Sequence, residues 1–202
     1  MFVQFIQGRV SDRHALKARM DQWIQDLKPG AEGWLGSTAG VTEDGRAITM
    51  ARFESEKAAR NNSDRPEQGE WWAQTERLFD GEVTFHDSTE VETGLQGGSD
   101  DAGFVQVIQG RATDPARVKA LFEEMAVYVG NNRPEVIGWT VGWYGDGGFT
   151  EFVYFTSEAD ARAGERRMEG EDERNTRMEE WRATLDGDPE FYDLKDPWMW
   201  SA

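Results

Sequence analysis

The chain has 202 residues, no cysteine and a formal net charge of −17. This negative charge argues against nucleic acid or an anionic membrane as a partner, because both are polyanions. The lack of cysteine excludes disulfides, thiol nucleophiles and cysteine-ligated metals. No apolar run approaches the roughly 18 residues that a membrane-spanning helix needs, so we expect a cytoplasmic protein.

One apolar stretch occurs twice and organises the rest of the chain. Residues 2–9 read FVQFIQGR and residues 104–111 read FVQVIQGR, which is a constant offset of 102. A repeat of this length indicates two copies of one structural unit. We therefore predict a first repeat at 1–91, a linker at 92–103, and a second repeat at 104–202 that ends in an aromatic tail. This tail is too aromatic to remain in water, so we expect it to pack on a neighbouring unit or a partner chain.

The first repeat predicts six elements in chain order. Residues 2–9 carry apolar side chains on both faces, which is typical of a central strand. Asp12 is a predicted N-cap for a helix whose apolar residues recur at helical spacing. These residues are Leu16, Met20, Trp23, Ile24 and Leu27. Strands at 34–41 and 47–54 flank a turn, Ser55 caps a second helix, and a last strand covers 82–87.

The second repeat predicts the same order. Adding 102 to the apolar positions of the first helix gives an apolar residue each time: Val118, Phe122, Met125, Ala126 and Val129. Each copy is thus a strand-helix-strand-strand-helix-strand unit, the ferredoxin-like βαββαβ arrangement of the α+β class. Such a unit has an antiparallel sheet with both helices on one face. Two copies predict that the sheets cover one another as an intrachain pseudo-dimeric α+β barrel.

With these elements in place, the chain resembles the dimeric α+β barrel superfamily, in particular its antibiotic-biosynthesis-monooxygenase-like branch. The resemblance rests on the opening strand, on the Gly-Trp pairs at 33–34 and 138–139, and on FESEKAAR at 53–60 and FTSEADAR at 155–162. It covers nearly the whole chain as a tandem fusion of what is usually two identical subunits. It implies cofactor-independent oxidation of an aromatic or quinone-like small molecule. Haem-degrading relatives use a first-strand Asn and a second-helix His, whereas this chain has Gln7 or Gln109 and no such His.

The predicted sheets carry the candidate site residues. The candidate catalytic residues are His86 and its counterpart Tyr192, because an imidazole is the side chain that titrates near neutral pH. The candidate ligand-binding residues are Gln4, Gln7, Gln106, Gln109, Arg52, Tyr154, Trp34, Trp139 and Trp143. The glutamines are open to two interpretations, a hydrogen bond within the sheet or a contact to a ligand. We expect the ligand cavity to be walled by the sheets.

The sequence leaves the choice between three functions open. It contains none of the common catalytic, phosphate-binding or metal-binding motifs, so we expect neither a metal nor another cofactor. The first function is the oxidation of a small aromatic molecule. The second is a module that binds a small hydrophobic ligand without catalysis, and the third is a purely structural barrel. Association of the chain into a homo-oligomer beyond the intrachain pair also stays open.

Overall fold

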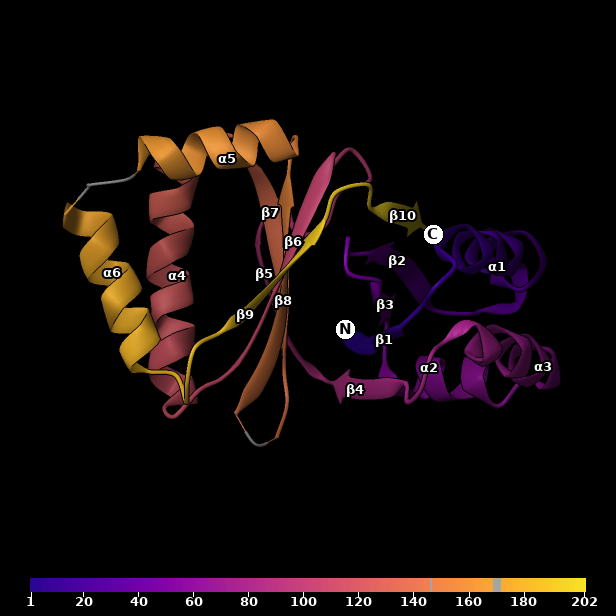
Figure 1. Cartoon of the computed structure of the whole chain (residues 1–202). Coiled ribbons are helices and arrows are strands. Elements are labelled where there is room, and N and C mark those ends of the chain that lie inside the picture. The colour runs from indigo at the N-terminus through magenta and orange to yellow at the C-terminus, as the bar shows by residue number, and fades with distance from the viewer. Residues whose placement is uncertain (146, 169–171) are drawn as a thin grey trace. The chain divides into compact units, whose positions relative to one another are not determined.

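The computed structural model describes residues 1–145, 147–168 and 172–202, with the side chains of all of these except 172–174. The chain forms two compact units, one of residues 1–91 and 197–202 and one of residues 92–196. Each unit consists of one sheet with its own helices (Figure 1).

The described residues of the first unit form a five-stranded sheet in the order β10-β2-β3-β1-β4. The strands are β1 (Phe2–Arg9), β2 (Trp34–Val41), β3 (Arg46–Phe53), β4 (Thr84–Ser88) and β10 (Trp198–Ser201). The helices are α1 (Arg13–Asp26), α2 (Glu56–Ser63) and α3 (Pro66–Thr75), with short 3₁₀ turns at Lys28–Gly30 and Glu76–Leu78.

The second unit repeats this arrangement in the order β5-β7-β8-β6-β9. Its strands are β5 (Glu90–Leu95), β6 (Phe104–Arg111), β7 (Val136–Trp143), β8 (Gly148–Phe155) and β9 (Glu190–Leu194). Its helices are α4 (Pro115–Asn132), α5 (Glu158–Arg167) and α6 (Asp172–Ala183), and all three lie on the same side of the sheet in Figure 1. The prediction of an α+β fold built from two ferredoxin-like repeats is confirmed. How the two sheets lie relative to each other stays a prediction.

The two copies agree in register as well as in order. Ile6 of β1 lies opposite Thr49 of β3, and Ile108 of β6 lies opposite Glu151 of β8, each 102 residues later. The predicted helix starts are also confirmed, since the Asp12 side chain accepts a hydrogen bond from the Ala15 amide at 2.9 Å. Asp114 and the two serine caps, Ser55 and Ser157, make the same contact. Among the described residues, no helix is long and apolar enough to cross a membrane.

The structure differs from the sequence-based division of the chain at two points. Part of the expected linker, residues 92–95, belongs to β5, which lies beside β7. The aromatic tail, expected in the second repeat, forms β10 and pairs with β2 of the first sheet. Trp198 of this tail is buried there against Leu16 and Val41. The tail therefore packs on a neighbouring unit, which was one of the two places expected for it.

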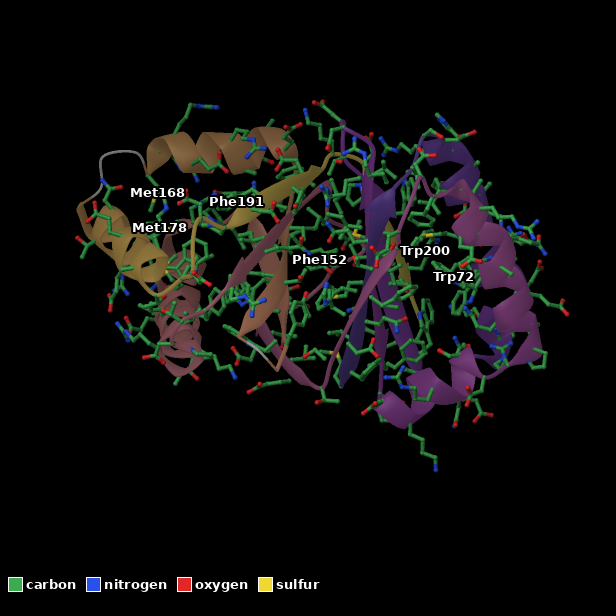
Figure 2. All side chains as sticks on the ribbon, turned by 60° about the horizontal axis from the view of Figure 1, so that its bottom comes forward. Trp72, Phe152, Met168, Met178, Phe191 and Trp200 are labelled. Carbon is green, nitrogen blue, oxygen red and sulfur yellow. The ribbon has the colours of Figure 1, made fainter. Side chains whose placement is uncertain are left out.

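Each sheet has a helix side and an opposite side, and strand alternation assigns every residue to one of them. On β6, Gln106 and Ile108 point to the helix side, whereas Val107 and Gln109 point to the opposite side. Figure 2 shows Met168 and Met178 on the helix side of the second sheet and Phe152 on the other side. This assignment decides which candidate site residues can meet.

Candidate functional site

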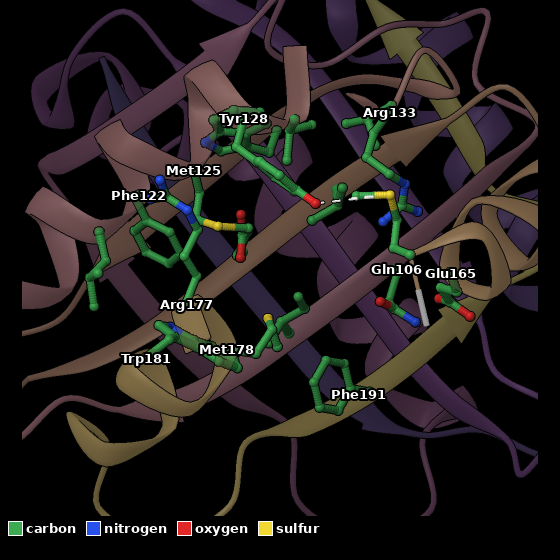
Figure 3. Close-up of a pocket in the computed structure, with 18 of the residues that line it drawn as sticks. Gln106, Phe122, Met125, Tyr128, Arg133, Glu165, Arg177, Met178, Trp181 and Phe191 are labelled. Atoms are coloured by element: carbon green, nitrogen blue, oxygen red, sulfur yellow. Dashed lines mark hydrogen bonds between the residues drawn. The ribbon is translucent and has the colours of Figure 1, made fainter. Parts of the chain in front are cut away.

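The second unit contains a cavity of about 310 Å³ between its sheet and its helices. This volume falls at the lower end of small-molecule sites, which span roughly 300–1,000 Å³. Most of its walls are apolar and include Ile108, Phe122, Met125, Trp139, Met178 and Phe191. In Figure 3, Gln106 and Glu165 lie at one end of the cavity, and Phe122, Arg177 and Trp181 lie at the other. The cavity is thus large enough for a small ligand and suits an apolar one.

Glu151 of β8 is the buried carboxyl group of this cavity, since only 6% of the residue is exposed. Burial raises the pKa of Glu151 from 4.5 to about 8. Its neighbours across the sheet are Ile108 on β6 and Val141 on β7, which offer the carboxylate neither a charge nor a donor. Within the described part of the chain the Glu151 side chain makes no hydrogen bond or ion pair. Desolvation without compensation therefore explains the shift.

A carboxyl group in this state has two chemical uses. Below pH 8 it is mostly neutral and donates a hydrogen bond, for example to a carbonyl oxygen of a ligand. When ionised it is a much stronger base than an exposed glutamate, because its proton affinity is higher. Perturbed carboxyls in cavities often mark functional sites for this reason.

Gln106 lines the same cavity and is held in place by a hydrogen bond to a carboxylate. Its Nε2 donates to Asp193 Oδ1 of β9 at 3.0 Å, and Arg162 of α5 pairs with the same carboxylate. The first unit repeats this arrangement, since Gln4 Nε2 donates to Asp87 Oδ1 at 2.8 Å. Arg60 of α2 is in turn 2.7 Å from Asp87. In both copies the glutamine amide thus hydrogen-bonds within the sheet, next to a cavity.

The corresponding cavity of the first unit is smaller, at about 100 Å³. Trp23 lies where the second repeat has Met125, and its ring packs 5.4 Å from that of Trp34. The Trp23 Nε1 donates to Gln68 Oε1 at 2.6 Å, which fixes the ring in the cavity wall. Thr49 takes the position of Glu151. The first cavity therefore lacks both the volume and the carboxyl group of the second.

The predicted site residues lie on two different sides of their sheets, and only those on the helix side can reach a cavity. Gln4 and Trp34 line the first cavity, and Gln106 and Trp139 line the second. Trp143 points to the same helix side and packs in the apolar cluster with Phe149. The remaining candidates lie on the opposite side of their sheets: Gln7, Arg52, His86, Gln109, Tyr154 and Tyr192.

His86 and Tyr192 occupy equivalent positions, as predicted. His86 lies opposite Phe5 on β1, and Tyr192 lies opposite Val107 on β6. Gln109 Nε2 donates to Thr150 Oγ1 at 3.0 Å on the same side as Tyr192. The structure thus does not bring His86 or Tyr192 to the cavities on the helix sides, and their catalytic role stays a prediction.

Sequence reasoning missed Glu151, although the repeat contained a signal for it. On a strand, residues two positions apart point to the same side, so Glu151 shares a side with its apolar neighbours Phe149 and Val153. Its counterpart 102 residues earlier is Thr49, which shows that the fold does not require a carboxyl there. Within the described residues, no group of three or more His, Cys, Asp or Glu could hold a metal ion.

Comparisons with known proteins identify the fold. No family model matches the sequence, and no curated protein does either. A candidate monooxygenase from Lactobacillus acidophilus NCFM is similar in structure with a TM-score of 0.72 at 11% identity, over 99% of both chains. One from Fusobacterium nucleatum has a TM-score of 0.76 at 10% identity, over 99% of this chain and 94% of its own.

An anthrone oxidase-like protein is similar over the same extent. Its TM-score is 0.72 at 11% identity, over 99% of this chain and 92% of its own. At these identities the similarity concerns the fold. The resemblance to monooxygenase-like proteins is confirmed at that level: this chain has the two-repeat α+β fold of these structures.

Proposed function

We propose that the second repeat is a cofactor-independent oxidase of a small aromatic molecule, with Glu151 as its general base. The observation that carries this proposal is the buried Glu151 carboxyl, whose pKa is raised to about 8 inside a cavity of about 310 Å³. The fold it shares with the structures above is compatible with this activity. The proposal concerns the second repeat because the first has Thr49 at this position.

The walls of the cavity favour a flat aromatic substrate. Phe122, Trp139 and Phe191 present aromatic rings, and Met125 and Met178 present flexible thioethers that adapt to the shape of a ligand. Burial of the substrate rings excludes water from the carboxyl group. This exclusion strengthens the electrostatic interactions between Glu151 and the reacting atoms.

The proposed reaction starts with the transfer of a proton from the substrate to Glu151. Ionised Glu151 removes a proton from a ring methylene that is conjugated to a carbonyl group, and this returns Glu151 to the neutral form favoured by its apolar surroundings. The resulting carbanion gives one electron to O₂, the two radicals join in a new C–O bond, and the peroxide anion takes the proton back from Glu151 to form a hydroperoxide. Loss of water from the hydroperoxide forms a second carbonyl group. In sum, CH₂ + O₂ gives C=O + H₂O, so O₂ is the oxidant and the methylene carbon is oxidised.

Anthrone is a suitable test substrate because its methylene group lies between two aromatic rings and is conjugated to the carbonyl. We expect the wild type to accelerate its conversion to anthraquinone above the rate in buffer, as followed by absorbance. Glu151→Gln and Glu151→Thr, the latter copying the first repeat, should each lower this acceleration about a hundredfold. The control is Glu123→Gln, the same substitution at an exposed position of α4.

Two results would contradict the proposal. If Glu151→Gln keeps the wild-type acceleration, Glu151 is not the base. If the wild type binds anthraquinone in the cavity but does not accelerate anthrone oxidation, the protein is a binding module. That second function has its own support, because Glu151 is mostly neutral below pH 8 and could donate a hydrogen bond to a ligand carbonyl.

A further inference from the structure

Three arginines line the cavity of the second unit in a chain whose net charge is −17. Arg133 already has a carboxylate partner, because its Nε donates a hydrogen bond to Glu135. Arg177 has partners as well, because its Nη1 lies 3.3 Å from Glu124 Oε2 and its guanidinium lies 5.9 Å from the centre of the Tyr128 ring.

Arg182 is the third arginine, and it differs from the other two. The side chains that the structure describes offer it no hydrogen bond or ion pair. The residue is exposed and also lines the cavity, so it lies at the cavity mouth. A ligand that enters the cavity therefore passes this residue.

The first repeat has the opposite charge at this position. An equivalent isolated β-bridge follows the last helix of each repeat. It joins Val10 to Phe79 in the first repeat and Ala112 to Leu185 in the second, so this part of the two repeats aligns at an offset of 106 (185 − 79). This offset makes Glu76 the counterpart of Arg182. The cation thus occurs in the repeat that has the larger cavity, and the shared fold does not require it.

We propose that the ligand of the second cavity is an aromatic carboxylate, whose rings enter the cavity and whose carboxylate binds Arg182. This inference rests on the proposed function, because it concerns the same cavity. The planar guanidinium offers parallel N–H donors that match the two oxygens of a carboxylate. A phosphate ester carries more charge and usually meets several donors or a helix N-terminus, whereas Arg182 offers one guanidinium.

The neighbouring side chain supports an aromatic group next to the carboxylate. Trp181 precedes Arg182 on α6, is buried, and lines the cavity with its indole ring. Thr75 is its counterpart in the first repeat. The second repeat therefore combines an aromatic wall and a cation where the first has a hydroxyl and a carboxylate.

The test compares two probes that share one ring system, 2-naphthoate and its neutral methyl ester. Their affinities are measured by isothermal titration calorimetry at pH 7 and low salt, with the full chain. We expect the wild type to bind 2-naphthoate roughly tenfold more tightly than the ester. Arg182→Gln should remove this preference and leave the affinity for the ester unchanged, and Arg182→Glu should weaken 2-naphthoate further. The control is Arg166→Gln, an exposed arginine of α5 that does not line the cavity.

The outcomes separate this inference from the proposed function. If Arg182→Gln keeps the preference for 2-naphthoate, or if Arg166→Gln loses it equally, the inference is wrong and the cavity remains a site for aromatic molecules. If Arg182→Gln weakens both probes to the same extent, the residue acts on the fold, and the inference is again wrong. If the wild type binds neither probe, the inference is wrong, whereas the proposed function is decided separately by the anthrone assay.

Discussion

Two buried glutamates of the second repeat show how local partners decide the state of a carboxyl group. Glu135 and Glu151 are 5% and 6% exposed. Burial would raise the pKa of Glu135, but hydrogen bonds from Arg133, its own backbone and Arg167 lower it below the usual value. Glu151 has no such donors, so burial raises its pKa to about 8. The first glutamate is therefore a paired anion, and the second is a carboxyl group that stays mostly neutral below about pH 8.

The raised pKa of Glu151 predicts a specific pH dependence of stability. The folded state holds this proton up to about pH 8, whereas the unfolded chain releases it near 4.5. The contribution of Glu151 to stability is thus fully present below pH 4.5 and is lost as the pH rises toward 8, by up to about 1.4 kcal/mol per pH unit. We expect urea unfolding to show that Glu151→Gln gains stability relative to the wild type between pH 5 and pH 8. A difference that does not change with pH would contradict this assignment.

At the scale of the elements, the first helix of each repeat sets the size of its cavity. α1 places Trp23 in the cavity wall, and α4 places Met125 at the equivalent position. The indole of Trp23 fills space and is fixed by its hydrogen bond to Gln68. A methionine fills less space and changes shape easily. One helix position therefore accounts for much of the difference between cavities of about 310 and 100 Å³.

An exchange of these two residues tests this explanation. We expect Met125→Trp to abolish the binding of methyl 2-naphthoate in the second unit, because the indole would fill the cavity, at a cost in stability of about 1–3 kcal/mol. Trp23→Met is the reciprocal variant, and it should leave binding in the second unit unchanged. Calorimetry and thermal unfolding measure both effects. Retention of wild-type affinity in Met125→Trp would show that this position does not control access.

The helices and strands could be predicted well from the sequence because the chain supplies each pattern twice. The apolar spacing of Leu16 and Trp23 recurs in Val118 and Met125, and each copy therefore supports the other. The site could not be predicted equally well, because Glu151 breaks the repeat. Its place on one strand face with Phe149 and Val153 can be read from the sequence, but its pKa depends on whether donors such as Arg133 surround it.

At the scale of the whole molecule, each repeat is followed in the chain by a strand that joins the sheet of the other repeat. β5 follows the first repeat and lies beside β7, and β10 follows the second repeat and pairs with β2. The sequence showed that the tail was too aromatic for water. It could not show where the tail pairs, because strand pairing over such a separation leaves no local pattern. At Gly94 of β5, an added Cβ would come within 1.8 Å of the Trp139 ring, so this edge strand requires a glycine there.

The C-terminal strand should matter for the stability of the first unit. Trp198 is buried in the core cluster of this unit, whereas Met199 lies opposite Thr38 and points to the other side of the sheet. We expect Trp198→Ala to lower the free energy of unfolding by about 3–5 kcal/mol. Met199→Ala, on the same strand, should cost less. Urea unfolding followed by circular dichroism measures both, and equal costs would contradict the role given to Trp198.

The central claim is that Glu151 is a buried carboxyl that titrates near neutral pH in the cavity of the second repeat. It is tested most directly by a carbon-13 NMR titration of the glutamate side-chain carboxyl groups, with Glu151→Gln to identify the resonance. The structure predicts one glutamate resonance that titrates near pH 8 in the wild type and is absent from the variant. If the resonance that the variant lacks titrates near 4.5, Glu151 is an ordinary carboxylate and the proposed chemistry is wrong.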